Sequence, residues 1–289
     1  MASLDGRVCL VTGGSRGVGR GVVLGLLEAG AIVHFTGRTQ AEGGHPDGLD
    51  RAGSLDTVLR DAAALPGEAV AHRCDHAEDR QTEAVVDAVL ARHGRLDCLV
   101  NNAWGGYERM VEGTEFTWPA PFWEQPLWRW DVMVGTGLRA AFVAARRAAP
   151  ALVSGGGGLI VNISFWAAQV HEGNLIYGVA KAGADKMAAD MAHELRPHGV
   201  AALALYPGLV RTEAVMKNAR FFDLSNSESP QFIGRVVAGL LTDPALLAKS
   251  GLVHVAAALA AEYGIADIDG RMPQPLSREG FVAGIQGGG

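Results

Sequence analysis

The chain has 289 residues, 48% of them hydrophobic, and a net charge of −6 from 25 basic and 31 acidic side chains. This length and hydrophobic content suffice for a full core. The charges are mixed along the sequence without a long basic run, so neither nucleic acid nor an anionic membrane surface is expected as a partner. No apolar run reaches the roughly 18 residues of a membrane span, so we expect no transmembrane helix.

The start of the chain and the cysteines indicate the cellular compartment. Residues 1–7 lack a charged segment followed by an apolar one, so no secretory signal is expected. Cys9, Cys74 and Cys98 stand in or beside apolar segments and have no CxxC spacing. An odd number of cysteines without that spacing argues against a disulfide framework and against a zinc site, and no metal is expected. The sequence therefore predicts buried free thiols and a reducing, cytoplasmic location.

Strand and helix signals alternate along the chain. Short apolar segments, some ending in glycine, predict buried parallel strands at residues 7–12, 31–36, 69–74, 96–101, 158–164, 200–206 and 252–255. Helices are predicted near residues 18–29, 54–65, 78–93, 128–152, 176–196 and 231–241. The alternation predicts a single Rossmann-type α/β domain over residues 1–285, a doubly wound, seven-stranded parallel sheet with helices on both faces. Residues 286–289 are expected to form a disordered tail.

The first predicted strand leads into a glycine-rich segment, TGGSRGVG at residues 12–19. Gly13, Gly17 and Gly19 permit a tight turn that brings a pyrophosphate to the N-terminus of the following helix. Tight strand-to-helix turns need glycine in any case, so the position in the first strand–helix unit is what favours a dinucleotide site.

The end of the second predicted strand indicates which dinucleotide is bound. Thr36-Gly37-Arg38-Thr39 contains no acid that could bind a ribose 2′-hydroxyl. Arg38 can pair with a 2′-phosphate, and Arg16 can add a second positive charge, so NADP(H) is expected. Both arginines could instead be solvated surface residues. Asp75, after the third strand, is a candidate for the adenine edge or a simple helix cap.

Tyr177 and Lys181 lie four residues apart in a predicted helix and therefore share one face. A phenol has a pKa of about 10, and a neighbouring ammonium lowers it. Ser164 stands 13 residues before Tyr177, at the end of a predicted strand, where its hydroxyl can hold a substrate oxygen. A tyrosine and a lysine on a helix are usually packing and solvated residues. Combined with the serine and the glycine-rich turn, they predict an oxidoreductase that uses a nicotinamide cofactor.

These features together resemble the short-chain dehydrogenase/reductase superfamily. The matching segments are residues 12–19, Asn101-Asn102-Ala103, Ser164, Tyr177-x-x-x-Lys181 and Pro207-Gly208. Residues 122–126, 137–139, 177–182, 192–196 and 267–271 further resemble one group of that family. That resemblance implies an NADPH-dependent reductase of small-molecule ketones or aldehydes, with a broad or poorly defined substrate range.

The resemblance also implies residue roles. Tyr177 would protonate the carbonyl oxygen, Lys181 would activate Tyr177 and bind the ribose, and Ser164 would orient the substrate. The implied cofactor contacts are Gly13, Ser15, Arg16, Val18 and Gly19 for the pyrophosphate, Asn101 and Ala103 for the adenosine, and Pro207, Gly208 and Thr212 over the nicotinamide. Pro207-Gly208 could equally be only a turn after the sixth strand.

Three positions depart from the family pattern. Trp104 replaces the glycine of the NNAG motif, and Ser164 is followed by Phe165 instead of a second serine. Many members have an asparagine in the helix after the fourth strand, where it anchors a water molecule of a proton relay. Gly135 is predicted at that position here, which leaves open an impaired relay.

Specificity is expected from aromatic segments. The candidates for the substrate pocket are Trp104 and the remainder of residues 104–130, then Phe165, Trp166 and His171, and residues 221–229. So many rings favour an apolar or ring-bearing substrate, although several could pack in the core or an interface, and His171 could be only a loop residue.

Two alternative functions and an oligomer remain open. The chain could be a catalytically weak NADP(H) sensor or assembly subunit, or a dehydrogenase that works in the oxidative direction, which Arg38 disfavours. Resemblance to family tetramers implies a homodimer or homotetramer paired through the helices that contain Val143, Ala144, Met187, Met191 and Leu195. Those side chains could equally face their own sheet.

Overall fold

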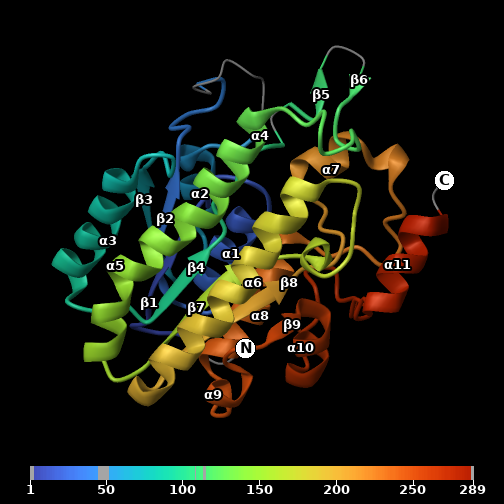
Figure 1. The fold of residues 1–289 in the computed structure, drawn as a ribbon. Helices are drawn as coiled ribbons and strands as arrows, with labels where there is room; N and C mark the ends of the chain where they lie inside the picture. Colours follow the sequence, from blue (N-terminus) through green and yellow to red (C-terminus); the bar gives the residue numbers. More distant parts are fainter. Residues whose placement is uncertain (1–2, 45–51, 108, 113–114, 288–289) are drawn as a thin grey trace.

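The computed structural model describes residues 3–44, 52–107, 109–112 and 115–287. Its centre is a seven-stranded sheet in the order β3-β2-β1-β4-β7-β8-β9, in which every pair of neighbours is parallel (Figure 1). The strands are β1 (Val8–Val11), β2 (Ile32–Gly37), β3 (Glu68–Arg73), β4 (Cys98–Asn101), β7 (Gly158–Ile163), β8 (Val200–Tyr206) and β9 (Val253–Val255). The predicted fold class and all seven predicted strands are confirmed.

The helices cover both faces of this sheet (Figure 1). They are α1 (Gly17–Glu28), α2 (Leu55–Ala62), α3 (Asp79–His93), α4 (Leu127–Val132), α5 (Ala140–Ser154), α6 (Leu175–Leu195), α7 (Glu213–Lys217), α8 (Pro230–Leu241), α9 (Leu246–Lys249), α10 (Ala256–Tyr263) and α11 (Arg278–Gly287). A small antiparallel pair, β5 (Val111–Glu112) and β6 (Glu115–Phe116), lies outside the main sheet. Residues 286 and 287 of the expected tail thus end α11, and residues 288–289 lie outside the described part of the chain.

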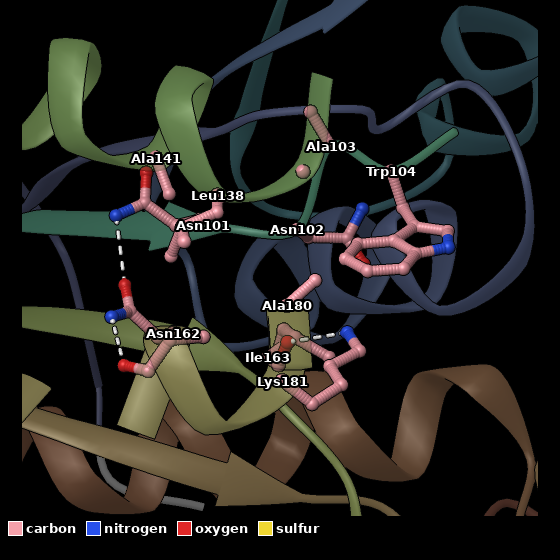
Figure 2. A pocket seen from close by; sticks show the side chains of 12 residues that line it. Asn101, Asn102, Ala103, Trp104, Leu138, Ala141, Asn162, Ile163, Ala180 and Lys181 are labelled. Atoms are coloured by element: carbon pink, nitrogen blue, oxygen red, sulfur yellow. Dashed lines mark hydrogen bonds between the residues drawn. The ribbon is translucent and has the colours of Figure 1, made fainter. Parts of the chain in front are cut away.

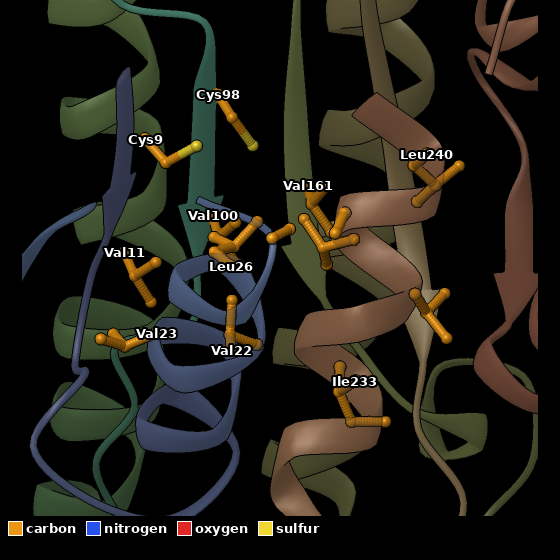
Figure 3. Packing of buried hydrophobic residues seen from close by; sticks show 14 of the residues in the cluster. Cys9, Val11, Val22, Val23, Leu26, Cys98, Val100, Val161, Ile233 and Leu240 are labelled. Carbon is orange, nitrogen blue, oxygen red and sulfur yellow. The ribbon is translucent and has the colours of Figure 1, made fainter. Parts of the chain in front are cut away.

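Alternate residues of each strand pack on opposite faces of the sheet. In β1, Cys9 and Val11 belong to the core cluster formed with α1 and α8, whereas Val8 and Leu10 belong to the cluster formed with α3, α5 and α6. Figure 3 shows the first cluster, in which Cys9 projects from β1 and Cys98 from β4. Because both faces are covered, the central strands carry apolar side chains at nearly every position. Cys9, Cys74 and Cys98 are buried and free.

The long helix predicted at residues 128–152 is composite. α4 passes through a π-helical segment, Met133–Arg139, before α5 begins. A π-helix widens the backbone by one residue per turn and occurs often at functional sites. Gly135 and Gly137 both lie in this segment. The periodicity of apolar residues predicted a helix here but carried no signal for the change in pitch.

Several side chains proposed for subunit pairing pack against their own sheet. Val143, Ala144 and Leu195 are buried within the chain. Met191 is partly buried against the hydrophobic cluster that contains Ala144 and Leu195. Within the described ranges, no helix has the length and apolar character required to cross a membrane.

Helices α1 and α8 approach each other at backbone distance. A Cβ atom at Gly21 would lie 1.9 Å from the backbone carbon of Pro230, and one at Gly25 would lie 2.6 Å from that of Gly234. Only glycine permits this approach, which packs the helix that begins at the glycine-rich turn firmly against α8 and the sheet.

Gly21→Ala is therefore expected to destabilise the fold by about 2 kcal/mol or more, because overpacking outweighs the roughly 1 kcal/mol gain in helix propensity. Gly135→Ala is the matched control, since a Cβ atom there meets no atom within 4 Å. Its stability in a urea titration should equal or exceed that of the unsubstituted protein. Equal stability of the two variants would contradict the packing argument.

Candidate active site

The glycine-rich turn is held between the ends of three strands. Thr12 Oγ1 accepts hydrogen bonds from the backbone N–H groups of Asn102 and Ala103, each at 3.0 Å. The Asn102 amide donates back to the carbonyls of Thr12 and Gly13, at 2.9 and 3.0 Å. From β2, Thr36 Oγ1 accepts the Gly13 N–H at 2.9 Å. Asn102 was quoted in the sequence motif without a role, and it joins β4 to the turn.

Two glycines of the turn have no room for a side chain. A Cβ atom at Gly19 would lie 2.2 Å from the Gly13 carbonyl oxygen, and one at Gly13 would lie 2.8 Å from Ala103 Cα. Gly13 also has a φ of 71°. A bound ligand can therefore approach the backbone at the start of α1 closely. A pyrophosphate site requires such an approach.

The N-terminus of α1 already receives an anion in this structure. The Gly17 N–H donates to a carboxylate oxygen of Glu213 at 2.9 Å, across 196 residues of sequence. The carboxylate stands in for the phosphate oxygens of a dinucleotide, because both are anions that accept N–H bonds at a helix N-terminus. The predicted phosphate-binding residues thus fit a dinucleotide. Ser15 and Gly19 are buried in the turn, and Arg16 and Val18 are partly exposed.

The residues predicted for the adenosine side follow β2, β3 and β4. Arg38 follows β2 and is partly exposed, with Gly37 ending the strand. Asp75 follows β3, and its Oδ1 accepts the Ala77 N–H at 3.0 Å. It closes a local turn and is not the residue that precedes α3, which is Glu78. The alternative reading of Asp75 as a helix cap was therefore wrong in its detail, since the turn lies before the helix.

The segment after β8 is braced by an acid that the sequence analysis did not single out. Gly208 N–H donates to Glu228 Oε2 at 2.8 Å, and Pro207 is buried beside it. Burial raises the pKa of Glu228 to about 7. Thr212 caps α7 by accepting the Val215 N–H at 3.3 Å. Pro207, Gly208 and Thr212 thus lie on one braced segment that leads directly to Glu213.

Tyr177 lies in an aromatic enclosure. Its ring centroid is 5.5 Å from that of Trp104, 5.3 Å from Trp118 and 6.1 Å from Tyr107. The side chain is 6% exposed. Burial raises the pKa of Tyr177 well above its usual value, and a hydrogen bond with Tyr107 adds to the increase. Tyr107 and Trp118 were visible in the sequence only as part of a long aromatic segment, of which residues 108 and 113–114 lie outside the described ranges.

Asn174 and Arg129 hold this enclosure together. Asn174 Oδ1 accepts the Tyr177 N–H at 3.0 Å, which caps α6, and its amide donates to the Trp118 carbonyl at 2.9 Å. Arg129 is fully buried and donates to the Thr117 carbonyl at 3.1 Å. A capping asparagine can be predicted from the sequence. The sequence does not distinguish a buried arginine from one on the surface.

Lys181 lies one helical turn from Tyr177. Its ammonium donates to the Ile163 carbonyl at 3.0 Å and sits 4.0 Å from the centroid of the Trp104 ring. The side chain is buried, and this burial lowers the pKa of Lys181 to about 8. The sequence predicted the shared helix face correctly, and the contact with Trp104 is new.

Ser164 hydrogen-bonds to α6 in this structure. Its hydroxyl donates to the Lys181 carbonyl at 3.3 Å, and a hydrogen bond links it to Asp185. The Tyr206 hydroxyl donates to the same carboxylate. Burial raises the pKa of Asp185, which is the largest effect on that group. The serine is thus buried within a polar network on the Lys181 side of the helix.

The other residues proposed for the substrate pocket lie in different surroundings. Phe165 is partly buried and packs against the cluster that contains Tyr177. Trp166 belongs to a different cluster, where its ring lies 5.2 Å from that of Tyr206. His171 is exposed. The ring of Phe281, on α11, lies 5.2 Å from that of Phe165, a contact between segments more than a hundred residues apart.

A cavity of about 20 Å³ lies beside Lys181 (Figure 2). Asn101 and Asn162 face it, and the Asn101 amide donates to Asn162 Oδ1 at 2.9 Å. Asn101 Oδ1 is buried without a hydrogen-bond partner. This volume accommodates one water molecule. Gly137 of the π-helical segment lines the cavity, whereas Gly135, the predicted counterpart of the family's asparagine, does not. A π-helical turn shifts which residue faces the cavity, relative to an alignment that assumes a regular α-helix.

Within the described part of the chain, no group of His, Cys, Asp or Glu side chains is arranged to hold a metal ion.

The chain resembles known proteins over most of its length. Residues 7–221 match the short chain dehydrogenase family. Dehydrogenase/reductase SDR family member 1 of Mus musculus is 39% identical over 285 residues, which cover 94% of this chain and 86% of that protein. The protein of that name from Homo sapiens is 37% identical, covering 99% of this chain and 91% of its own. The group resemblance in the shorter segments is thereby confirmed.

Two solved structures agree in fold and differ in cofactor. A 7α-hydroxysteroid dehydrogenase complexed with NADH and 7-oxo glycochenodeoxycholic acid has a TM-score of 0.71 and 25% identity, covering 88% of this chain and 93% of its own. A metagenomic short-chain oxidoreductase in complex with NADP has a TM-score of 0.65 and 31% identity, covering 84% and 93%. The family match and the likeness in fold thus agree, and the chain belongs to the short-chain dehydrogenase/reductase family of oxidoreductases, which act on CH–OH or C=O groups with a nicotinamide dinucleotide.

Proposed function

We propose that the protein is an NADPH-dependent reductase of ketones or aldehydes in which Tyr177 donates the proton. The observation that carries this proposal is the pairing of Tyr177 with Lys181 inside a dry aromatic enclosure, next to a turn that accepts an anion at α1. The Lys181 ammonium lies 5.7 Å from the Tyr177 ring centroid, close enough to stabilise negative charge on the phenol oxygen.

The chain's own residues supply binding and proton transfer. The nicotinamide supplies the hydride when it is bound. Tyr177 protonates the carbonyl oxygen, and Lys181 stabilises the phenolate that remains. Ser164 orients the substrate oxygen after its hydroxyl turns away from the Lys181 carbonyl. Trp104, Tyr107 and Trp118 exclude water from the reacting atoms.

Arg38 supports a preference for NADP(H), since it follows β2 where no carboxylate is present to bind a ribose 2′-hydroxyl. Arg16, in the glycine-rich turn, adds positive charge on the same side. We assign the adenosine contacts to Asp75, Asn101 and Ala103 at the ends of β3 and β4.

The aromatic lining supports an apolar or ring-bearing substrate. Trp104, Tyr107, Trp118 and Phe165 all belong to, or pack on, the cluster around Tyr177. Rings of this kind bury an apolar ligand and leave a few polar groups to orient it. A homo-oligomer is proposed from exposed apolar side chains on α5 and α6, among which Phe142 is 51% exposed and Val179 43%.

Tyr177→Phe tests the central assignment. The variant should bind NADPH as the unsubstituted protein does and lose at least about a hundredfold in turnover of a carbonyl panel, the usual contribution of a general acid. Tyr107→Phe is the matched control, because it removes a neighbouring phenol without removing the proton donor, and it should lose much less. Full turnover by Tyr177→Phe would remove the assignment and favour a cofactor-binding sensor.

Arg38→Ala tests the cofactor preference. Loss of a charge-assisted bond to the 2′-phosphate should weaken NADPH binding about tenfold to a hundredfold and leave NADH binding nearly unchanged. Fluorescence titration with both dinucleotides measures the effect. Arg20→Ala, which removes an arginine paired with Asp61 on the surface of α1, should alter neither affinity. An equal loss for both dinucleotides would show that Arg38 does not read the 2′-phosphate.

Glu213→Gln tests the anion position at α1. The carboxylate occupies the Gly17 N–H and repels an incoming pyrophosphate, so its neutral analogue should bind dinucleotides severalfold more tightly. The factor should be the same for NADPH and NADH, because both carry the pyrophosphate. Weaker or unchanged binding in the same titration would place the pyrophosphate elsewhere.

A further inference from the structure

The Trp104 ring contacts two functional positions at once. One face lies 4.0 Å from the Lys181 ammonium, and the ring lies edge to face with Tyr177 at 5.5 Å. A cation over an aromatic ring at this distance is attracted by the negative face of the ring, most strongly over tryptophan. In Figure 2 the indole and the end of the lysine lie on the same side of the pocket.

The same ring occupies the space in front of Gly137. A Cβ atom at Gly137 would lie 2.5 Å from Trp104 Cζ3 and 2.7 Å from Cε3. Even alanine at this position would therefore have to displace the indole. The steric requirement is specific, because a Cβ atom at Gly135, two residues earlier in the same π-helical segment, meets nothing within 4 Å.

We infer that Trp104 is a positioning residue that holds Lys181 through its ring face, and that Gly137 is glycine because this ring needs its volume. The inference rests on the proposed function, in which Lys181 supports Tyr177. The ring comes from the segment after β4, and it lines the same water-sized cavity as Asn101 and Lys181.

Few of the described charged side chains surround the Lys181 ammonium, so the Trp104 ring can affect the pKa of Lys181. Burial lowers the pKa of Lys181 to about 8. The titratable groups that face it are Tyr177 and Asp185, both on α6, and Asp185 opposes the decrease. The facing side chains from β4 and from the π-helical segment, Asn101 and Leu138, carry no charge. The Trp104 ring therefore favours the ammonium from outside α6, together with the Ile163 carbonyl.

The pKa of Lys181 is measured directly by NMR on cofactor-free protein that contains ¹³Cε-lysine, with Lys181→Met used for assignment. Trp104→Leu keeps the site apolar and removes the ring, so the pKa of Lys181 should fall by roughly one pH unit. Trp104→Phe keeps a weaker ring face and should give a smaller decrease. Trp118→Leu is the matched control, because it removes an indole that packs on Tyr177, and it should leave the Lys181 value unchanged.

Gly137→Ala should lower the same pKa, because the added methyl group displaces the ring from the lysine. In the Trp104→Leu background it should have little further effect, since the smaller side chain leaves room, and this loss of additivity identifies the coupled pair. Gly135→Ala should retain the original value. Full additivity of Gly137→Ala and Trp104→Leu would overturn the steric half of the inference.

Activity supplies an independent comparison. The alkaline midpoint of kcat/KM for NADPH-dependent reduction should move to lower pH in Trp104→Leu by the same amount as the NMR value. An unchanged or raised Lys181 pKa in Trp104→Leu would overturn the inference, even if turnover fell. Failure of the proposed function is distinguishable, because full turnover by Tyr177→Phe would remove the catalytic assignment while the NMR titration still reports on the ring and the lysine.

Discussion

The hydrogen bonds between Thr12 and Asn102 join the end of β1 to the end of β4, and the rest of the site depends on that junction. Thr12 Oγ1 accepts two backbone N–H groups from the segment after β4, and the Asn102 amide donates to two carbonyls of the glycine-rich turn. The turn that presents α1 to an anion and the backbone that carries Trp104 are thus fixed relative to each other. Buried backbone groups that would otherwise lack partners are satisfied at the same point.

Helix α6 carries Tyr177 and Lys181 in buried surroundings, at an electrostatic cost. Burial opposes ionisation of both Tyr177 and Lys181, and it acts in opposite senses on their pKa values. The aromatic segment that causes this burial is itself anchored by the fully buried Arg129 and by the cap residue Asn174. The enclosure raises the pKa of the phenol, and the Trp104 ring lies 4.0 Å from the ammonium whose charge burial disfavours.

Sequence patterns predicted the sheet, its seven strands and most of the helices, because buried strands and amphipathic helices have characteristic periods. They also predicted that Tyr177 and Lys181 share a helix face. They carried no signal for the π-helical turn at Met133–Arg139, which has no periodicity of its own. The short α7 and α9, together with α10 and α11, were not predicted, and Phe281 of α11 reaches Phe165 only through the tertiary fold.

The sequence alone determined the family of this protein, the order of the strands along the chain and the residue types available for cofactor binding and proton transfer, because motif spacing and periodicity are local properties. Only the tertiary structure decided which of those residues meet. Glu213 reaches Gly17 across 196 positions, and Trp104 fills the volume left open by Gly137. Trp166 packs in a different cluster from Tyr177 for the same reason, and His171 is exposed. Contacts between distant segments depend on packing geometry and burial, which no single stretch of sequence contains.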